Sequence, residues 1–286
     1  MPISGAARLA GIMGWPVAHS RSPALHGFWL AEHNIDGAYV PLAVPPDRLC
    51  QALRALPALG FRGCNLTIPH KETALAVMDR VEPFARRIGA MNTVVVAADG
   101  SLEGSNTDVF GFRENLREQA PDWDPAAGPA VVLGAGGSAR AVVAALNAAG
   151  IEEIRLLNRT GARAEALAAD LAQPGTRITV EPWEARAATL REAGILVNTT
   201  SLGMEKSPPL ALDLSLLPVS AVVVDIVYVP LETGLLAAAR RRGNRTVDGL
   251  GMLLHQGRPG FGAWFGVPVT VTPALRAAML ATFGVR

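Results

Sequence analysis

The chain has 286 residues, of which 50% are hydrophobic and 18% are charged. A compact domain usually holds about 100–200 residues, so this length predicts two units, and the composition excludes a disordered chain. The formal net charge is +1, with acidic and basic residues interleaved. Such a chain lacks the dense basic surface that binds a phosphate backbone, so nucleic acid is not expected as a partner.

The cysteines, the N-terminus and the histidines predict a compartment and exclude some classes of site. Cys50 and Cys64 cannot build a disulfide scaffold, which favours a reducing compartment. The first residues lack the pattern of a signal peptide, and no stretch reaches the roughly 18 apolar residues that span a bilayer. We therefore expect a cytoplasmic protein with no membrane partner. The five histidines are scattered without metal-binding spacing, so no metal is expected.

Short apolar runs alternate with segments of helical period in the N-terminal half, which is the pattern of an α/β fold. These runs predict strands at residues 8–14, 38–44, 63–68 and 93–97. The periodicity predicts helices near residues 23–33, 47–56, 71–78, 83–88 and 109–118, the first with Ser22 as its cap and Pro23 in its first position. The Asp99-Gly100 pair favours a tight hairpin turn after residue 97.

A second α/β run follows a loop at residues 119–128. It predicts strands at residues 130–133, 154–157, 178–180, 195–198, 221–225 and 245–247, and six strands suit a doubly wound, Rossmann-type sheet. Beyond Asp248 the pattern is helical again at residues 251–256 and 273–283. This tail is too short for a third domain, so we expect it to pack on one of the other two. The Arg240-Arg241-Arg242 run is interpreted as a solvated helix end.

A glycine-rich motif directly follows the strand predicted at residues 130–133 and opens a helix that runs to Ala149. It reads Gly134-Ala135-Gly136-Gly137-Ser138-Ala139. In such a motif the first glycine allows a tight turn, the second lets the backbone approach a pyrophosphate, and the helix N–H groups face the anion. The motif predicts a dinucleotide site, and a plain strand-to-helix turn is the alternative.

The residues after the next strand indicate which dinucleotide binds. An NAD site expects Asp or Glu here to bond the ribose 2′-hydroxyl, whereas this chain has Asn158-Arg159-Thr160. Arg159, helped by Thr160 and by Arg163 one turn later, offers charge-assisted bonds to a 2′-phosphate. We therefore predict NADP as the cofactor, with ordinary surface arginines as the alternative.

Short polar residues gather at predicted strand ends in the N-terminal half, where open parallel sheets bind ligands. They suit a small ligand with several hydroxyl groups, and the set is Ser20, Ser22, Asn65, Thr67, Lys71, Asn92 and Thr93. Each has a structural alternative, such as a helix cap, a backbone partner in a turn or a solvated lysine.

Lys71 and Asp108 are the candidate catalytic pair, because reducing a carbonyl needs a proton donor beside the forming alkoxide. Partial burial lowers the pKa of a lysine, and a nearby aspartate raises it and orients the ammonium group. Asp108 as a simple N-cap of the helix at residues 109–118 is the alternative.

Together these segments resemble the shikimate dehydrogenase family along nearly the whole chain. In the first half the matching segments are GWPVAHSRSP at residues 14–23, NLTIPHK at 65–71, GAMNTV at 89–94 and NTD at 106–108. In the second half they are GAGGSA at residues 134–139, NRT at 158–160, NTTSLGM at 198–204, DIVYVP at 225–230 and GMLLHQG at 251–257.

The resemblance implies an oxidoreductase of aromatic amino acid biosynthesis that reduces 3-dehydroshikimate to shikimate with NADPH, in a cleft between two α/β domains. It implies a shikimate-binding domain at residues 1–107, completed by helices at 248–286, and an NADP-binding Rossmann domain at 108–247. It gives Lys71 and Asp108 as the catalytic pair, and Ser20 and Ser22 as ligands of the substrate carboxylate. The residues implied for the ring hydroxyls are Thr67, Lys71, Asn92, Asp108, Tyr228 and Gln256. Besides residues 134–139, 158–160 and Arg163, those implied for the cofactor are Thr199, Ser201, Gly203, Met204, Ile226, Gly249 and Met252.

Other functions remain as alternatives. A folate-linked methylene dehydrogenase would need an aromatic side chain to stack on the pterin, and the chain has only two tyrosines, Tyr39 and Tyr228. A non-catalytic NADPH sensor would have no reason to keep Lys71 with Asp108. Neither Ser20 nor Ser22 is a threonine, the change that would point to relatives favouring quinate. Gly27 departs from the Asn that the family often has there, and aminoshikimate-type paralogues stay open. A monomer or a homodimer is expected.

Overall fold

The computed structural model describes residues 3–283 and divides into two compact units. Unit 1 comprises the residues up to Thr107 together with those from Leu253 onward, and unit 2 runs from Asp108 to Met252. No helix among residues 3–283 is long and apolar enough to cross a membrane.

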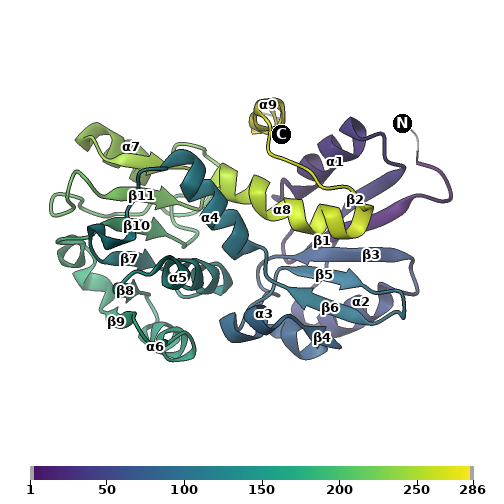
Figure 1. Ribbon diagram of the computed structural model, residues 1–286, viewed down its shortest axis with the longest axis horizontal. Helices are drawn as coiled ribbons and strands as arrows, with labels where there is room; N and C mark the ends of the chain where they lie inside the picture. Colours follow the sequence, from purple (N-terminus) through teal and green to yellow (C-terminus); the bar gives the residue numbers. More distant parts are fainter. Residues whose placement is uncertain (1–2, 284–286) are drawn as a thin grey trace. The chain divides into compact units, whose positions relative to one another are not determined.

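Unit 1 is built on a mixed six-stranded sheet in the order β2-β1-β3-β5-β6-β4 (Figure 1). β1 pairs in parallel with β2 and β3, whereas β5 is antiparallel to both β3 and β6. The strands are β1 (Arg8–Gly14), β2 (Gly37–Ala43), β3 (Phe61–Leu66), β4 (Arg80–Val81), β5 (Thr93–Val96) and β6 (Leu102–Ser105).

The helices of unit 1 come from both ends of the chain. They are α1 (Ser22–Glu32), α2 (Leu49–Ala55), α3 (Pro83–Ile88), α9 (Pro273–Ala281) and most of α8 (Gly249–Phe265), with 3₁₀ turns η1 (Pro46–Arg48) and η2 (Thr73–Val77). α9 contacts α1, and the Trp29 indole donates to the carbonyl of Thr270 at 3.3 Å. The C-terminal residues therefore pack on the N-terminal elements.

An aromatic cluster fills the space between α1, β2 and α8. The ring of His26 stacks on Tyr39 with centroids 3.9 Å apart, and the rings of Phe261 and Trp264 lie at centroid distances of 5.9 and 5.7 Å from it. His26 is fully buried, and burial lowers its pKa to about 3. The cluster thus holds a neutral imidazole as one of its packed rings.

Unit 2 contains a six-stranded sheet in the order β12-β11-β10-β7-β8-β9, with every pairing parallel. Read from β9, this is the 3-2-1-4-5-6 order of a doubly wound dinucleotide fold. The strands are β7 (Ala130–Leu133), β8 (Glu153–Leu157), β9 (Arg177–Glu181), β10 (Ile195–Asn198), β11 (Val222–Asp225) and β12 (Arg245–Val247). The predicted fold class, an α/β chain with a Rossmann-type unit, is confirmed.

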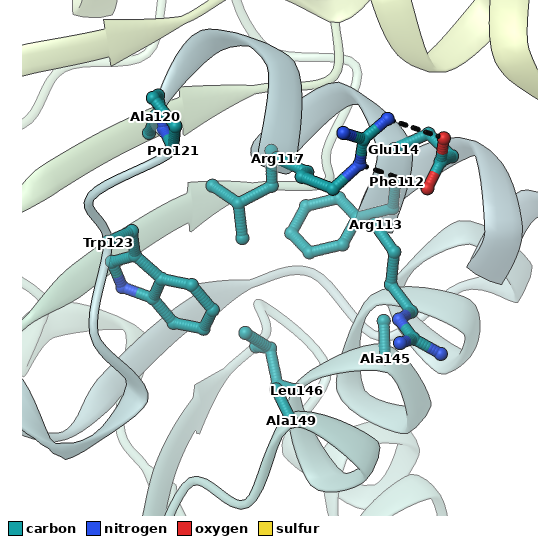
Figure 2. A pocket seen from close by; sticks show the side chains of 11 residues that line it. Phe112, Arg113, Glu114, Arg117, Ala120, Pro121, Trp123, Ala145, Leu146 and Ala149 are labelled. Atoms are coloured by element: carbon teal, nitrogen blue, oxygen red, sulfur yellow. Dashed lines mark hydrogen bonds and ion pairs between the residues drawn. The ribbon is translucent and has the colours of Figure 1, made fainter.

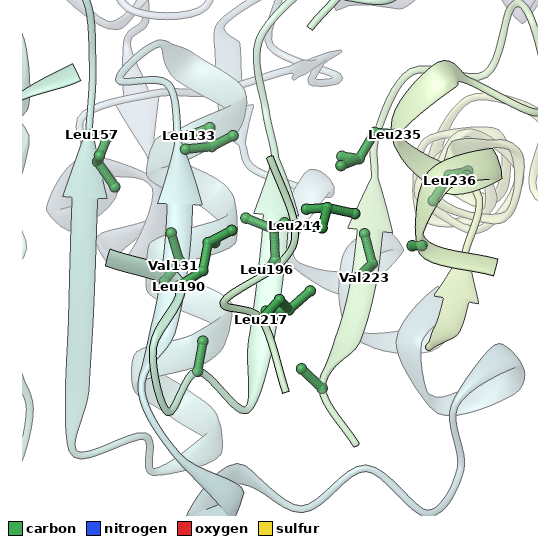
Figure 3. Packing of buried hydrophobic residues seen from close by; sticks show 13 residues of the cluster. Val131, Leu133, Leu157, Leu190, Leu196, Leu214, Leu217, Val223, Leu235 and Leu236 are labelled. Atoms are coloured by element: carbon green, nitrogen blue, oxygen red, sulfur yellow. The ribbon is translucent and has the colours of Figure 1, made fainter. Parts of the chain in front are cut away.

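Helices and buried side chains cover this sheet. The helices are α4 (Asp108–Gln119), α5 (Gly137–Ala149), α6 (Gly161–Asp170) and α7 (Gly234–Arg242), with 3₁₀ turns η3 (Pro125–Ala127), η4 (Trp183–Ala185) and η5 (Ala188–Leu190). Figure 3 shows Val131, Leu196 and Val223 on neighbouring strands. Leu214 and Leu217, from the segment between β10 and β11, pack against them. The central strands β7, β10 and β11 are short, apolar and buried because both faces of the sheet are covered.

Several predicted elements differ from the structure. Ser22 is not the cap of α1: the helix begins at Ser22, and the Ser20 hydroxyl accepts from the Ser22 N–H at 3.3 Å. The helix predicted at residues 71–78 is only the 3₁₀ turn η2, because the Lys71 carbonyl accepts from the Met91 N–H at 2.8 Å instead of from a following turn. The hairpin turn at Asp99-Gly100 is confirmed, and β6 follows it as a strand that the sequence pattern did not reveal.

Candidate active site

The glycine-rich motif forms the turn between β7 and α5. Gly134 follows the last residue of β7 and has φ of +111°, a backbone conformation that side chains disfavour. A Cβ built on it would lie 2.5 Å from Thr199 Oγ1. Glycine is therefore required at this position by the fold itself, before any ligand is considered.

Gly136 differs from Gly134 because nothing in the structure occupies the space beside it. A Cβ built on Gly136 would have no heavy atom within 4 Å, and its φ of −100° suits any residue. Gly136 is the N-cap of α5 and makes no side-chain cap bond to this helix. Open space beside the N-terminus of a helix fits a pyrophosphate group.

Basic residues follow β8, the strand beside β7 in the sheet. The Asn158 amide donates to the Thr160 carbonyl at 2.9 Å and so fixes the turn into α6. Arg159, Thr160 and Arg163 are exposed at this turn. Two guanidinium groups and no carboxylate between residues 158 and 163 suit a phosphate on the ribose 2′ position.

The loop after β10 lies against the glycine-rich turn. The Thr199 N–H and hydroxyl both donate to the Leu133 carbonyl, at 2.9 and 2.6 Å. Ser201 is exposed, Gly203 and Met204 are half-buried, and the Gly203 N–H donates to the Pro208 carbonyl at 2.8 Å. The structure therefore brings the predicted residues of this loop beside the predicted pyrophosphate site.

The remaining predicted cofactor residues of unit 2 lie after β11 and at the start of α8. Ile226 directly follows β11, and a Cβ on Gly249, the first residue of α8, would collide with the Ile226 carbonyl. Met252 is buried. Gly249 thus allows α8 to begin against the segment that follows β11.

The polar residues of unit 1 meet at one end of its sheet. β1 and β3 run in the same direction, and β5 runs back, so the start of β5 lies beside the end of β3, with Asn65 opposite Thr93. β6 returns again, with Ser105 opposite Thr93. The segments after β1, β3 and β6 and before β5 therefore share one edge, as the sequence predicted from strand ends.

Asn92 is the centre of the hydrogen bonds at this edge. Its amide N–H groups donate to Thr107 Oγ1 at 3.0 Å and to Gln256 Oε1 at 3.1 Å, and its Oδ1 accepts from the Thr107 N–H at 2.7 Å. Asn92 follows Met91, whose N–H donates to the Lys71 carbonyl at 2.8 Å. The structure thus brings together Asn92, Gln256 and the backbone of Lys71.

The other predicted residues fall around this cluster or in unit 2. Ser20 and Ser22 lie at the start of α1, with Ser22 buried, and Thr67 donates its N–H to the Met13 carbonyl at the end of β1 at 2.9 Å. Lys71 is half-buried. Asp108, 4% exposed, is the first residue of α4, and Tyr228 follows β11, so these two belong to unit 2.

Two buried residues that the sequence did not assign to these sites lie close to their members in the structure. The Tyr39 hydroxyl donates to Asn65 Oδ1 at 2.7 Å, and Asn65 donates to the Asn92 carbonyl at 3.0 Å. Asp225, at the end of β11, is fully buried, and burial raises its pKa to about 6. The sequence signal that could have identified Asp225 is its place as a charged residue at the end of an apolar strand.

A pocket in unit 2 lies apart from the predicted site residues. It is lined by residues of α4, α5 and the loop between α4 and β7, among them Leu116, Arg113 and Arg117. Figure 2 shows the Trp123 ring and Leu146 at this pocket. Arg117 is paired with Glu114 at 3.0 Å. None of the lining residues belongs to the predicted substrate or cofactor set.

Comparison with known proteins identifies close relatives of the whole chain. A family model described as shikimate dehydrogenase substrate binding domain matches residues 12–94, and one described as shikimate / quinate 5-dehydrogenase matches residues 119–205. The shikimate dehydrogenase (NADP(+)) of Rhodospirillum rubrum is 63% identical over 279 residues, covering 97% of this chain and 99% of the relative.

Two solved structures are similar in fold. Shikimate 5-dehydrogenase from Thermus thermophilus, in complex with NADP(H) and shikimate, has a TM-score of 0.82 at 41% identity, covering 95% of this chain and 98% of that one. Quinate dehydrogenase from Corynebacterium glutamicum, in complex with NAD, has a TM-score of 0.88 at 32% identity, covering 96% and 99%.

Proposed function

Since this chain belongs to the shikimate dehydrogenase family, we infer that it catalyses the reversible, NADPH-dependent reduction of 3-dehydroshikimate to shikimate. The observation that carries this inference is the cluster at the sheet edge of unit 1, where Asn92 and Gln256 are bonded and the backbone of Lys71 lies next to them. Amide, hydroxyl and ammonium groups at one edge suit a small ring with several hydroxyl groups.

NADP is the cofactor that the residues of unit 2 fit. The N–H groups at the start of α5 and the open space beside Gly136 would hold the pyrophosphate, and Arg159 with Arg163 would hold the 2′-phosphate. When bound as NADPH, this cofactor supplies a hydride to the ketone carbon. The loop from Thr199 to Met204, with Ile226, Gly249 and Met252, would complete the cofactor site.

Substrate recognition is assigned to the polar residues of unit 1 and two residues of unit 2. The hydroxyls of Ser20 and Ser22 would donate to the carboxylate of the substrate. The ring hydroxyls would contact Thr67, Lys71, Asn92, Asp108, Tyr228 and Gln256. The hydrogen bonds that Asn92 makes with Thr107 hold its amide in one orientation, so it is ready to bind without reorganisation.

Lys71 and Asp108 are proposed to handle the proton. As negative charge develops on the carbonyl oxygen, the Lys71 Nζ donates a proton to it, and Asp108 keeps the ammonium oriented and charged. In the reverse direction the neutral amine of Lys71 accepts the proton from the hydroxyl of shikimate. Burial of Asp108 favours a direct interaction with a cation or with the substrate over one with water.

The other features of the enzyme follow the same proposal. The N-terminal domain at residues 1–107, with the helices at 248–286, would bind shikimate, and the domain at 108–247 would bind NADP. We propose a monomer or homodimer in the cytoplasm, and the unpaired thiols of Cys50 and Cys64 support a reducing compartment.

The proposed function is tested by mixing purified protein with shikimate or quinate, each in the presence of NADP or NAD. The absorbance of the reduced cofactor is followed in these four mixtures. Rapid reduction of NADP with shikimate, and little with the other three mixtures, is the expected result. Equal rates with quinate and NAD would contradict both the choice of substrate and the role of Arg159.

A further inference from the structure

Asp225 is a buried carboxylate without a role in the site described above. It ends β11, which lies between β10 and β12 in the parallel sheet, and it is 0% exposed. Three neutral groups donate to it: the Asn198 amide at 3.0 Å, the Val227 N–H at 3.0 Å and the Thr233 hydroxyl at 2.7 Å. Burying a charge among neutral partners costs stability, so stability alone does not explain a carboxylate at this position.

The carboxylate fixes which way the neighbouring amide points. Asn198 ends β10 directly opposite Asp225 in the register of the two strands. An ionised carboxylate can only accept, so Asn198 must present its Nδ2 to Asp225 and its Oδ1 to the other side. That Oδ1 accepts from the Thr200 N–H at 3.1 Å and from the Thr200 hydroxyl at 2.7 Å.

The same amide reaches further into the loop after β10. Asn198 Nδ2 also donates to the Leu202 carbonyl at 3.2 Å, so one side chain holds both the start and the middle of the loop. The loop begins with Thr199, which donates twice to the Leu133 carbonyl beside the glycine-rich turn. Asp225 is therefore connected, through Asn198, to the loop that faces the proposed pyrophosphate site.

We propose that Asp225 is a positioning residue for the cofactor: through Asn198 it sets the conformation of the loop from Thr199 to Met204. The identity of the cofactor rests on the proposed function, whereas the link between Asp225 and the loop rests on the hydrogen bonds alone. Asp225 does not touch the cofactor in this proposal. Its carboxylate can only accept, so it reinforces the orientation of Asn198 in which Oδ1 accepts from the Thr200 N–H and Nδ2 donates to the Leu202 carbonyl; an amide in its place would not reinforce it.

The test is Asp225→Asn, read by amide hydrogen exchange in the ligand-free protein and by NADPH fluorescence titration. An Asn at 225 can meet Asn198 in either orientation, so Thr200 and Leu202 should exchange faster, while the core strands β7 and β8 keep their protection. NADPH affinity should fall roughly tenfold or more, as for loss of a hydrogen bond to a charged group, and shikimate affinity should change less than about twofold.

Two further variants separate positioning from general destabilisation. Asn198→Asp combined with Asp225→Asn exchanges the two groups. The carboxylate at 198 must again accept from Thr200, so protection of the Thr200 N–H should return, whereas the bond from residue 198 to the Leu202 carbonyl stays lost. Thr272→Ala removes the hydroxyl that caps α9 in unit 1, where Thr272 accepts from the Leu275 N–H at 3.1 Å. This control should lower stability without altering exchange in the loop or NADPH affinity.

The outcomes distinguish the two proposals. Unchanged exchange at Thr200 and Leu202 in Asp225→Asn would overturn the positioning role, whatever the enzyme catalyses. Faster exchange throughout unit 2, with no recovery in the double variant, would also overturn it and leave a purely structural role. If the wild type binds NADPH but does not oxidise shikimate, the proposed function fails, and the exchange data still decide the role of Asp225.

Discussion

Replacing Gly134 with Ala should destabilise unit 2 by an amount that the geometry predicts. A φ of +111° is disfavoured for an L residue by about 1–2 kcal/mol. The new Cβ would lie 2.5 Å from Thr199 Oγ1 and 3.2 Å from Thr200 Cγ2, so the loop after β10 must move, at a cost of about 1–3 kcal/mol. Together these give about 2–5 kcal/mol, a large part of the total stability of a domain.

Gly136→Ala is the matched control, because it adds the same methyl group two residues away. Residue 136 has φ of −100°, and a Cβ there has no heavy atom within 4 Å, so the free energy of unfolding of Gly136→Ala should differ from that of the wild type by less than about 1 kcal/mol. The methyl group would occupy the space that a pyrophosphate needs, so NADPH affinity should fall at least about tenfold. Gly134→Ala should therefore lower mainly the free energy of unfolding, and Gly136→Ala should lower mainly the affinity for NADPH.

Urea unfolding followed by circular dichroism measures the first effect, and NADPH fluorescence titration measures the second. Gly134→Ala should lower the unfolding midpoint without changing the slope by much. A wild-type midpoint for Gly134→Ala would refute the requirement for glycine at the end of β7. Wild-type NADPH affinity for Gly136→Ala would refute the placement of the pyrophosphate beside α5.

Three further predictions concern charge. Arg159→Ser should weaken NADP binding about tenfold or more and leave NAD binding unchanged, whereas the same change at the exposed Arg241 of α7 should alter neither affinity; equal losses for NADP and NAD would contradict the role of Arg159. Lys71→Ala should lower turnover roughly 10²–10⁴-fold, measured by stopped flow, while titration shows that NADP still binds. Full activity of this variant would refute the role of Lys71 as proton donor. His26 has a pKa lowered to about 3, so the folded state resists its protonation and stability falls as pH drops below about 6.5. His26→Phe should remove about 3 kcal/mol of the loss in unfolding free energy between pH 7 and 4.5, and an unchanged pH profile would show that His26 is not the acid-sensitive group.

The central strands of the parallel sheet in unit 2 were well predicted because they are buried on both faces. β7 and β10 have the predicted bounds, since each is an apolar run with a clear end; β12 also has them, although it carries Arg245 and Thr246. Unit 1 was harder to predict. β4 has two residues and β6 carries Glu103 and Gly104, so neither shows an apolar run, and both form because neighbouring strands offer them partners.

The length of α8 could not be read from the sequence. Its pattern ends near Gln256, and glycines and Pro259 follow, yet the helix continues to Phe265. Gly257 lies where a Cβ would be 3.0 Å from Leu25 and 3.2 Å from Trp29, so the small residue permits close packing of α8 on α1. Tertiary contact here overrides a poor helix propensity.

The candidate site was predictable as residue types and strand ends, but not as a network. Strand order decides that Asn65 lies opposite Thr93, and this order depends on the antiparallel return of β5, which no motif encodes. The partnership of Asn92 with Gln256 joins residues that are 164 positions apart. Asp225 could not be assigned a partner at all until its strand was placed beside β10.

The aromatic cluster has a consequence for the order in which the protein folds during synthesis. Trp264 donates its indole N–H to the Val94 carbonyl at 2.9 Å and, like Phe261, packs on the ring of His26. Both residues leave the ribosome only after all of unit 2 has been made. The nascent N-terminal elements can therefore assemble the core around Leu53 and Leu66, but the side of the sheet that packs on His26 lacks its aromatic partners until residue 264 has been made. We expect this side to be the one most prone to aggregation during synthesis.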